Sequence, residues 1–281
     1  MAIRIVTDST ADLPTNVVQD FGITVVPLHI YFGEEQFEDG LTISRDEFYR
    51  RLALHETAFP RTSAPSAGEF ERAYTQLLSG DDEVISIHLS HKLSATFTSA
   101  AAAQSSLRSR GSVAVIDSGT VSLALGLLVL QAAQMAREGA GMRQIIEATT
   151  AALPRTRFFG VLDTLEYLRR GGRIGRAAAL LGSLLQAKPL IGLRDGVAYP
   201  IERARGRQRS LERIVQLAKE HGALSHLAVG HTTDPAGMES LAERLAHHFP
   251  LQRILQARCG ATLGTYLGPG AYGVAFIQSS I

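Results

Sequence analysis

The chain has 281 residues, enough for two domains, and its 45% apolar and 20% charged residues are typical of a folded protein with a buried core. A single cysteine, Cys259, excludes a disulfide framework, and the longest apolar stretch, from Val121, is shorter than the roughly 18–20 residues that cross a bilayer, so we expect a cytoplasmic protein without stable membrane insertion. The formal charge is −7 for residues 1–154 (11 Lys and Arg against 18 Asp and Glu) and +8 for residues 155–281 (17 against 9), which favours an anionic ligand or acidic partner for the second half, or pairing of the two halves.

The first half alternates short apolar runs with segments of helical periodicity. Serines at 44 and 66, each followed three residues later by Glu, are helix-capping signals. This alternation predicts a parallel sheet with helices on both faces. The expected strands are 3–9, 23–30, 84–89 and 113–118, and the expected helices start at 44, 66, 95, 121 and 142.

The second half contains two apolar runs joined by the turn Arg194-Asp-Gly196, which predicts a β-hairpin and therefore a mixed sheet with helices. Pro154 and the charge shift mark the boundary between an N-terminal α/β domain, 1–155, and a C-terminal α/β domain, 156–281, with a basic surface. The expected strands are 158–163, 190–193, 197–202, 226–231 and 273–278, and the expected helices are 164–170, 177–186, 210–222 and 236–249.

Hydroxyl side chains follow several of the predicted strands of the first half. Ligands of open parallel sheets bind at the carboxyl ends of the strands, where hydroxyl groups and helix N-termini bind anions. Each such residue is also a good helix cap, so ordinary capping is the alternative. The clusters are Asp8 to Thr10, Thr62 with Ser63, Ser90 with Ser94 and Thr96, and Asp117 with Ser118.

No catalytic or cofactor motif is convincing. The stretch 268–273 matches G-x-G-x-x-G, but a predicted strand follows it where a dinucleotide site needs a helix. A serine nucleophile needs a histidine base, and His88 within a strand and His91 in a loop do not form a recognisable triad. We expect no catalytic residue, no cofactor, no metal and no nucleic-acid partner. A Ser-dependent acyl hydrolase or acyltransferase, with Ser94 or Ser63 as nucleophile, is the alternative.

Six segments together resemble the DegV family of bacterial fatty-acid-binding proteins, in the family's order and over essentially the whole chain. The resemblance implies two α/β domains with a long-chain fatty acid between them. Some members are the acyl-carrier subunit of a fatty acid kinase and present the carboxylate to a separate, ATP-dependent kinase subunit. The segments are TDSTADLP (7–14), TSAPSAGEF (62–70), LSHKLSATFTSA (89–100), VIDS (115–118), LEYLRRGGRIG (165–175) and GTYLGPGAYG (264–273).

The resemblance also implies roles for individual residues. Thr62 and Ser94 match hydroxyls that bind the carboxylate, and both are expected at helix starts, with Ser63 and Thr96 as their neighbours. Thr265 and Tyr266 lie in a ligand-binding segment in which the family usually has histidine where this chain has Tyr266. Arg173 matches a family arginine near the head group or the partner face, and Arg205 falls where the family usually has an Arg-Thr pair and this chain has Arg-Gly. With Arg176 and Arg207, both are expected to form a cationic face near the mouth of the pocket, for phosphate or the kinase subunit. Ala95 replaces a usual glycine beside the carboxylate site.

Two helical segments are candidates for the walls of the acyl slot. Residues 95–107 are rich in small side chains and residues 121–135 are almost entirely apolar. Both compositions suit buried core equally well.

Overall fold

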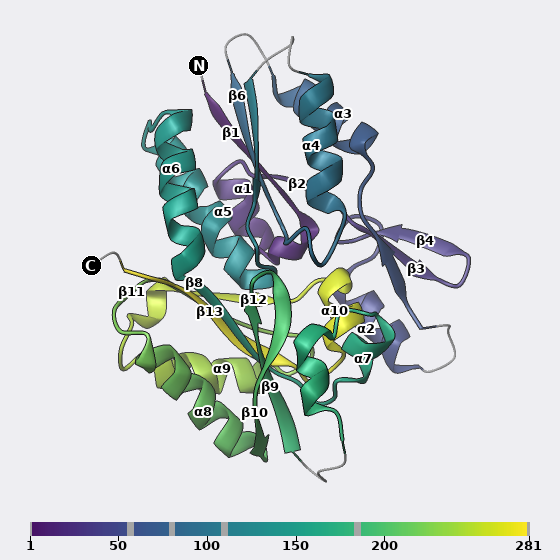
Figure 1. The fold of residues 1–281 in the computed structure, drawn as a ribbon, viewed down its shortest axis with the longest axis vertical. Coiled ribbons are helices and arrows are strands. Elements are labelled where there is room, and N and C mark those ends of the chain that lie inside the picture. Colours follow the sequence, from purple (N-terminus) through teal and green to yellow (C-terminus); the bar gives the residue numbers. More distant parts are fainter. Residues whose placement is uncertain (1, 55–58, 79–81, 108–111, 183–186, 280–281) are drawn as a thin grey trace.

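The computed structural model describes residues 2–54, 59–78, 82–107, 112–182 and 187–279. This part of the chain contains a four-stranded, a three-stranded and a six-stranded sheet. Figure 1 shows the four-stranded sheet beside the N-terminus at one end of the molecule and the six-stranded sheet at the other, with the small sheet projecting to one side. The predicted boundary between residues 155 and 156 lies where β8 begins, and the division into two domains stays a prediction.

The N-terminal sheet is parallel throughout, as predicted. Its strands are, in spatial order, β2 (Thr24–Val26), β1 (Ile3–Asp8), β6 (Glu83–His88) and β7 (Ser112–Asp117). Helices α5 (Ser122–Arg137) and α6 (Met142–Ala152) cover one face, and α3 (Ala67–Leu77) and α4 (Thr96–Ser106) cover the other. Side chains of a strand alternate between faces. Ile5 accordingly packs in a cluster with Leu125 of α5, whereas Val6 packs in a cluster with Phe70 of α3.

Both predicted capping serines begin a helix. The Ser66 hydroxyl accepts a hydrogen bond from the Glu69 amide, and the Glu69 side chain returns to the Ser66 backbone. Ser44 caps α2 (Arg45–Ala53) in the same way, but the side chain of Glu47 pairs instead with two arginines of the helix.

The three-stranded sheet was not predicted. It consists of β4 (Glu35–Glu38), β3 (His29–Phe32) and β5 (Arg61–Ser63), which are antiparallel. The expected single strand at 23–30 is wrong, because the chain leaves the first sheet after Val26 and enters the small sheet at His29. Pro27 lies between the two strands, where its missing N–H would interrupt a continuous ladder.

The C-terminal sheet is mixed, as predicted. Within the described residues only β11 and β12 pair in parallel. The expected hairpin is present, and its turn residues Asp195 and Gly196 both have positive φ, as a type I′ hairpin turn requires. The spatial order is β10 (Val197–Arg205), β9 (Ala187–Arg194), β8 (Thr156–Val161), β13 (Tyr272–Gln278), β11 (Leu224–His231) and β12 (Ile254–Arg258), of which β12 was not predicted.

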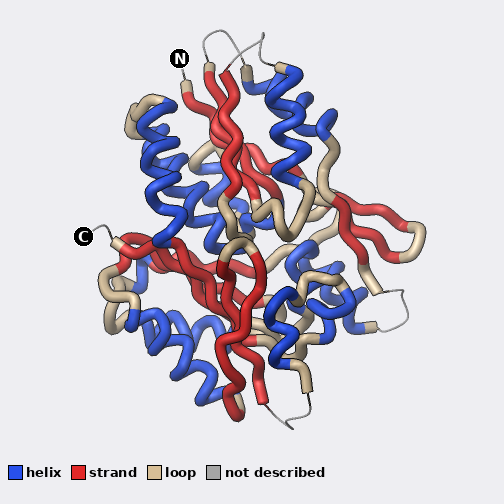
Figure 2. Tube along the Cα trace, viewed as in Figure 1, coloured by secondary structure: helices blue, strands red, loops and turns tan. Residues whose placement is uncertain are grey.

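Helix α5 lies between the two large sheets. One side packs on β1 and β6 of the N-terminal sheet, and the other packs on β8, β11 and β13 of the C-terminal sheet. This double burial explains why the helix is apolar around almost its whole circumference. Helices α8 (Arg207–Glu220) and α9 (Pro235–Leu245) cover the outer face of the C-terminal sheet, which Figure 2 shows as helices flanking strands.

The remaining elements are short. The predicted helix 177–186 is wrong where it is described, since a 3₁₀ helix covers Gly175–Leu180, and residues 183–186 lie outside the described residues. In the part of the chain that the structure describes, no helix is long and apolar enough to cross a membrane. The short elements are α1 (Thr15–Asp20), α7 (Glu166–Arg170), α10 (Ala261–Leu267), and the 3₁₀ turns Ser9–Ala11, Leu153–Arg155 and Leu251–Arg253.

Candidate functional site

A cavity of about 220 Å³ lies between the N-terminal sheet, the C-terminal sheet and α10. Thr10, Leu89 and Val121, which follow β1, β6 and β7, line one side of it. Strands β8, β9 and β10 line the other side through residues such as Phe158 and Ile191. The cavity therefore lies at the carboxyl ends of the parallel strands, where open sheets bind ligands.

Most of the cavity wall is apolar. Thirteen of the twenty lining residues are Leu, Ile, Val, Phe or Ala, and none is acidic. A wall of this kind suits an apolar ligand that carries one polar or anionic group. The polar lining residues are Thr10, Thr62, Ser63, Ser94, Arg173, Thr262 and Tyr266.

The two helices expected as walls contribute little to the cavity. Only Ala95 and Val121, at their N-terminal ends, line it, so α4 and α5 are mainly core. Ala95 precedes α4 with φ of −73° and ψ of 1°, a conformation open to any residue. Its Cβ therefore causes no backbone strain at the cavity edge.

Thr62 and Tyr266 meet across the cavity. Thr62 lies in β5, paired with Ile30 of β3, so its expected position at a helix start is wrong. Its Oγ1 is 2.6 Å from the hydroxyl of Tyr266, which α10 carries. The neighbouring Ser63 hydroxyl is 3.3 Å from the Tyr31 hydroxyl. Hydroxyl groups from two distant parts of the chain thus converge at the cavity wall.

Ser94 lies in the loop directly before α4, close to the helix start at which it was expected. Its Oγ accepts a hydrogen bond from the amide of Thr96, the first residue of the helix, although the N-cap position itself is Ala95. The same oxygen is 2.9 Å from Oγ1 of Thr96. Ser94 is half-buried and lines the cavity, whereas Thr96 is buried and does not.

Arg173 is the one cationic residue among the cavity-lining residues. Its Nε donates to the Leu93 carbonyl at 3.1 Å and its Nη1 to the Gly171 carbonyl at 2.8 Å. The guanidinium carbon is 5.1 Å from the centroid of the Tyr266 ring, within cation–π range. The ring itself lies against Gly171, where an added Cβ would come within 2.4 Å of it. Glycine at 171 therefore allows Arg173 and Tyr266 to stack at the cavity.

Three other residues implied by the resemblance do not line the cavity. Arg205 is exposed at the end of β10, seven residues beyond the cavity-lining Ala198, or roughly 20 Å at the usual strand rise. Arg207 nearby pairs with Asp234. The structure therefore does not bring Arg205 and Arg207 to the cavity beside Arg173. Thr265 is buried and donates to the Ala261 carbonyl within its own helix.

Two cavity-lining hydroxyls were missed as site residues. Thr10 belongs to the predicted hydroxyl cluster after the first strand, which was the available signal. Thr262 precedes Tyr266 by four residues, and this spacing places both on one face of α10. Because α10 itself was not predicted, this spacing could not be recognised from the sequence.

Neither serine proposed as a nucleophile has a base in the described residues. The hydrogen bonds of Ser63 and Ser94 go to other hydroxyls or to backbone amides. A serine–histidine–aspartate chain does exist at Ser86, His88 and Asp8, but all three side chains are fully buried. A nucleophile must reach its substrate, so this chain is not arranged for acyl transfer.

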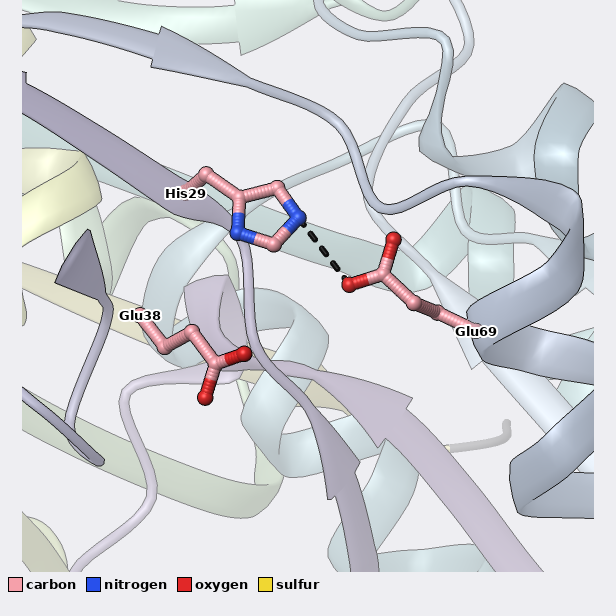
Figure 3. Close-up of side chains that lie close together, drawn as sticks. All are labelled: His29, Glu38 and Glu69. Carbon is pink, nitrogen blue, oxygen red and sulfur yellow. Dashed lines mark ion pairs between the residues drawn. The ribbon is translucent and has the colours of Figure 1, made fainter. Parts of the chain in front are cut away.

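One group of side chains has metal-ligand chemistry, shown in Figure 3. Nε2 of His29 pairs with Oε1 of Glu69 at 3.0 Å, and Glu38 lies opposite His29 across β3 and β4. The possible ligand atoms of the three side chains all lie within 4.8 Å of one another. The other Glu69 oxygen already accepts from Ser66. The group is best described as an ion pair that ties α3 to the small sheet.

Asp12 is a buried carboxylate next to the start of α10. Its Oδ1 accepts from the Gly260 amide and its Oδ2 from the Ser122 hydroxyl, both at 2.7 Å. Burial raises the pKa of Asp12 from its usual 3.8 to about 6, and nearby Asp39 acts in the same direction, while both hydrogen bonds and Arg45 oppose the rise.

The raised pKa of Asp12 makes stability depend on pH. The folded protein binds the Asp12 proton more tightly than the unfolded chain does. The stability that this proton binding contributes is therefore fully present below about pH 4, and it is lost as the pH rises through about 6. A shift of about two units corresponds to about 3 kcal/mol. We expect Asp12→Asn to become more stable relative to wild type by about this amount between pH 4 and 7. Denaturant unfolding at pH 4 and pH 7 measures the free energy of unfolding of both proteins. A difference in this free energy that is the same at the two pH values would contradict the prediction.

The DegV family model, described as "Uncharacterised protein, DegV family", matches residues 2–279. A DegV domain-containing protein of Deinococcus radiodurans is 39% identical over 282 residues, covering 98% of each chain.

Solved structures agree over the same length. A DegV family protein from Thermus thermophilus, described in terms of fatty acid binding, superposes with a TM-score of 0.91 at 32% identity, covering 99% of this chain and 100% of that one. DegV from Bacillus subtilis, described as a fatty acid binding protein, gives 0.89 at 34% identity with the same coverage. With its parallel N-terminal sheet, mixed C-terminal sheet and matched length, the chain belongs to the DegV family.

Proposed function

We propose that the protein binds a long-chain fatty acid between its N-terminal and C-terminal domains, without catalysing a reaction on it. The observation that carries this proposal is the apolar cavity with hydroxyls and Arg173 grouped on its wall. The Thermus and Bacillus relatives, both described as binding fatty acids, support it.

The alkyl chain would supply most of the affinity. Each methylene buried is worth about 0.8 kcal/mol, so a chain of fifteen or so methylenes has ample driving force. A second, smaller cavity shares Phe158, Ile191 and Leu267 with the first, and it extends the apolar space along the C-terminal sheet. The alkyl chain of the fatty acid could extend into this space, away from the hydroxyl groups.

The carboxylate would lie against Thr62, Ser63, Ser94, Tyr266 and Arg173. Hydroxyls and a guanidinium are donors that a carboxylate accepts, and Arg173 supplies the balancing charge. These five residues are only half-buried, which leaves the head group within reach from outside.

We further infer that the protein presents this carboxylate to a separate, ATP-dependent kinase subunit in the cytoplasm. Phosphoryl transfer to the carboxylate would give an acyl phosphate, and the ATP-binding machinery would belong to the partner. The second half of the chain is basic overall and exposes Arg205, which supports docking of an acidic partner there.

Lipid analysis of freshly purified protein tests the binding proposal. We expect organic extraction to release about one free long-chain fatty acid per chain, with the denatured protein at its unmodified mass. An acyl adduct on Ser94 or Ser63 would instead favour the hydrolase or acyltransferase alternative. Protein that carries no lipid and binds no added C14–C18 acid would contradict the proposal. Formation of acyl phosphate with a cognate kinase subunit and ATP tests the presentation step separately.

A further inference from the structure

The N-terminal end of α10 is held by two buried carboxylates from the other half of the chain. Oδ1 of Asp39 accepts from the Ala261 amide at 2.9 Å, and Oδ2 accepts from the Thr262 amide at 3.0 Å. Oδ1 of Asp12 accepts from the Gly260 amide. Three successive amides at the helix start therefore donate to carboxylates more than two hundred residues away in sequence.

Helix α10 depends on such outside support. It has seven residues, fewer than an isolated helix needs to be stable, and its N-cap, Gly260, has no side chain to satisfy the first amides. Asp39 supplies a cap in trans, and its negative charge lies at the positive end of the helix.

The opposite side of the helix has no room to move. A Cβ added to Gly264 would come within 2.4 Å of the Phe48 ring of α2, and the Tyr49 hydroxyl donates to the Cys259 carbonyl just before the helix. With one side fixed by α2 and the end fixed by Asp39, the cavity face of α10 holds Thr262 and Tyr266 in place.

We propose that Asp39 is a positioning residue for the head-group site, which it serves by fixing α10 so that Tyr266 meets Thr62 and Arg173. This inference rests on the proposed fatty-acid binding. Asp39 itself does not line the cavity, and each of its carboxylate oxygens accepts from one of the two amides. Its effect on the ligand is therefore transmitted through the helix.

The test compares Asp39→Ala and Asp39→Asn with wild type, and uses Asp20→Asn, an exposed aspartate, as the matched control. Two probes are titrated: an 18-carbon fatty acid and the 18-carbon primary alcohol. We expect Asp39→Ala to weaken binding of the acid about tenfold or more, since bonds to a charged group are the stronger ones, and binding of the alcohol less than about threefold. Asp39→Asn keeps one acceptor oxygen, so its affinity for the fatty acid should lie between those of wild type and Asp39→Ala. Asp20→Asn should bind both probes as wild type does.

A second readout does not depend on the ligand. Amide hydrogen exchange of unliganded Asp39→Asn and Asp39→Ala should speed up in 260–267 and remain unchanged in β1 and β6. Equal loss of affinity for acid and alcohol, or wild-type affinity for both in Asp39→Ala, would overturn the positioning role. If wild type binds neither probe, the proposed function fails, and unchanged exchange in 260–267 would then separately overturn the role of Asp39. If Asp39→Ala does not fold, the affinity and the hydrogen-exchange measurements are both made on Asp39→Asn.

Discussion

Replacing Arg173 by alanine is expected to weaken fatty-acid binding by about ten- to a hundredfold, because a hydrogen bond to a charged group contributes about 1.5–3 kcal/mol. Arg173 is the cation among the cavity-lining residues, and it stacks on Tyr266. Arg205→Ala, an exposed arginine at the far end of β10, should leave the affinity unchanged and is the matched control.

Arg173→Lys separates charge from shape. Lysine keeps the positive charge but lacks the planar fork that bonds the Leu93 and Gly171 carbonyls, so it should restore only part of the affinity. Titration of a labelled fatty acid at two salt concentrations measures all three variants, and melting temperatures check the fold. Equal affinity of Arg173→Ala and wild type would show that Arg173 does not contact the head group.

Much of the fold was predictable from the sequence where local and global signals coincide. Apolar strands such as 84–89, the capping serine Ser66 and the Asp-Gly turn at 195–196 each act over a few residues. The small sheet was not predicted, because its strands have no local sequence signal. Strands β4 (EQFE) and β5 (RTS) are short and polar, and only their pairing with β3 makes them strands.

The site was predictable in part. Thr62, Ser94, Arg173 and Tyr266 were expected through the family resemblance, and the structure brings them to one cavity. Thr262 was missed, since α10 forms through remote contacts that no local pattern encodes. Arg173 and Arg205 do not form the expected joint cationic face, because Arg205 lies at the end of β10 that is away from the cavity.

The second large effect concerns stability. Asp8 is fully buried at the end of β1, and its carboxylate accepts hydrogen bonds from the Thr10 amide and hydroxyl, the Leu89 amide and Nδ1 of His88. Asp8→Ala would leave all four donors buried without an acceptor. Removing one partner of a buried polar network costs about 3–5 kcal/mol, so we expect the free energy of unfolding to fall by about this amount.

The other side chains of this buried hydrogen-bond network provide a control with a smaller expected effect. Nε2 of His88 is 2.6 Å from Oγ of Ser86, which accepts from the Tyr74 hydroxyl at 2.9 Å. Ser86→Ala removes one hydroxyl and leaves Asp8 with its four donors, so it should cost only about 1–3 kcal/mol. Urea unfolding measures both variants. A cost below about 1 kcal/mol for Asp8→Ala would mean that water or neighbouring groups replace the carboxylate. Because Thr10 both donates to Asp8 and lines the cavity, the same network that stabilises the sheet edge also orients one wall of the proposed fatty-acid site.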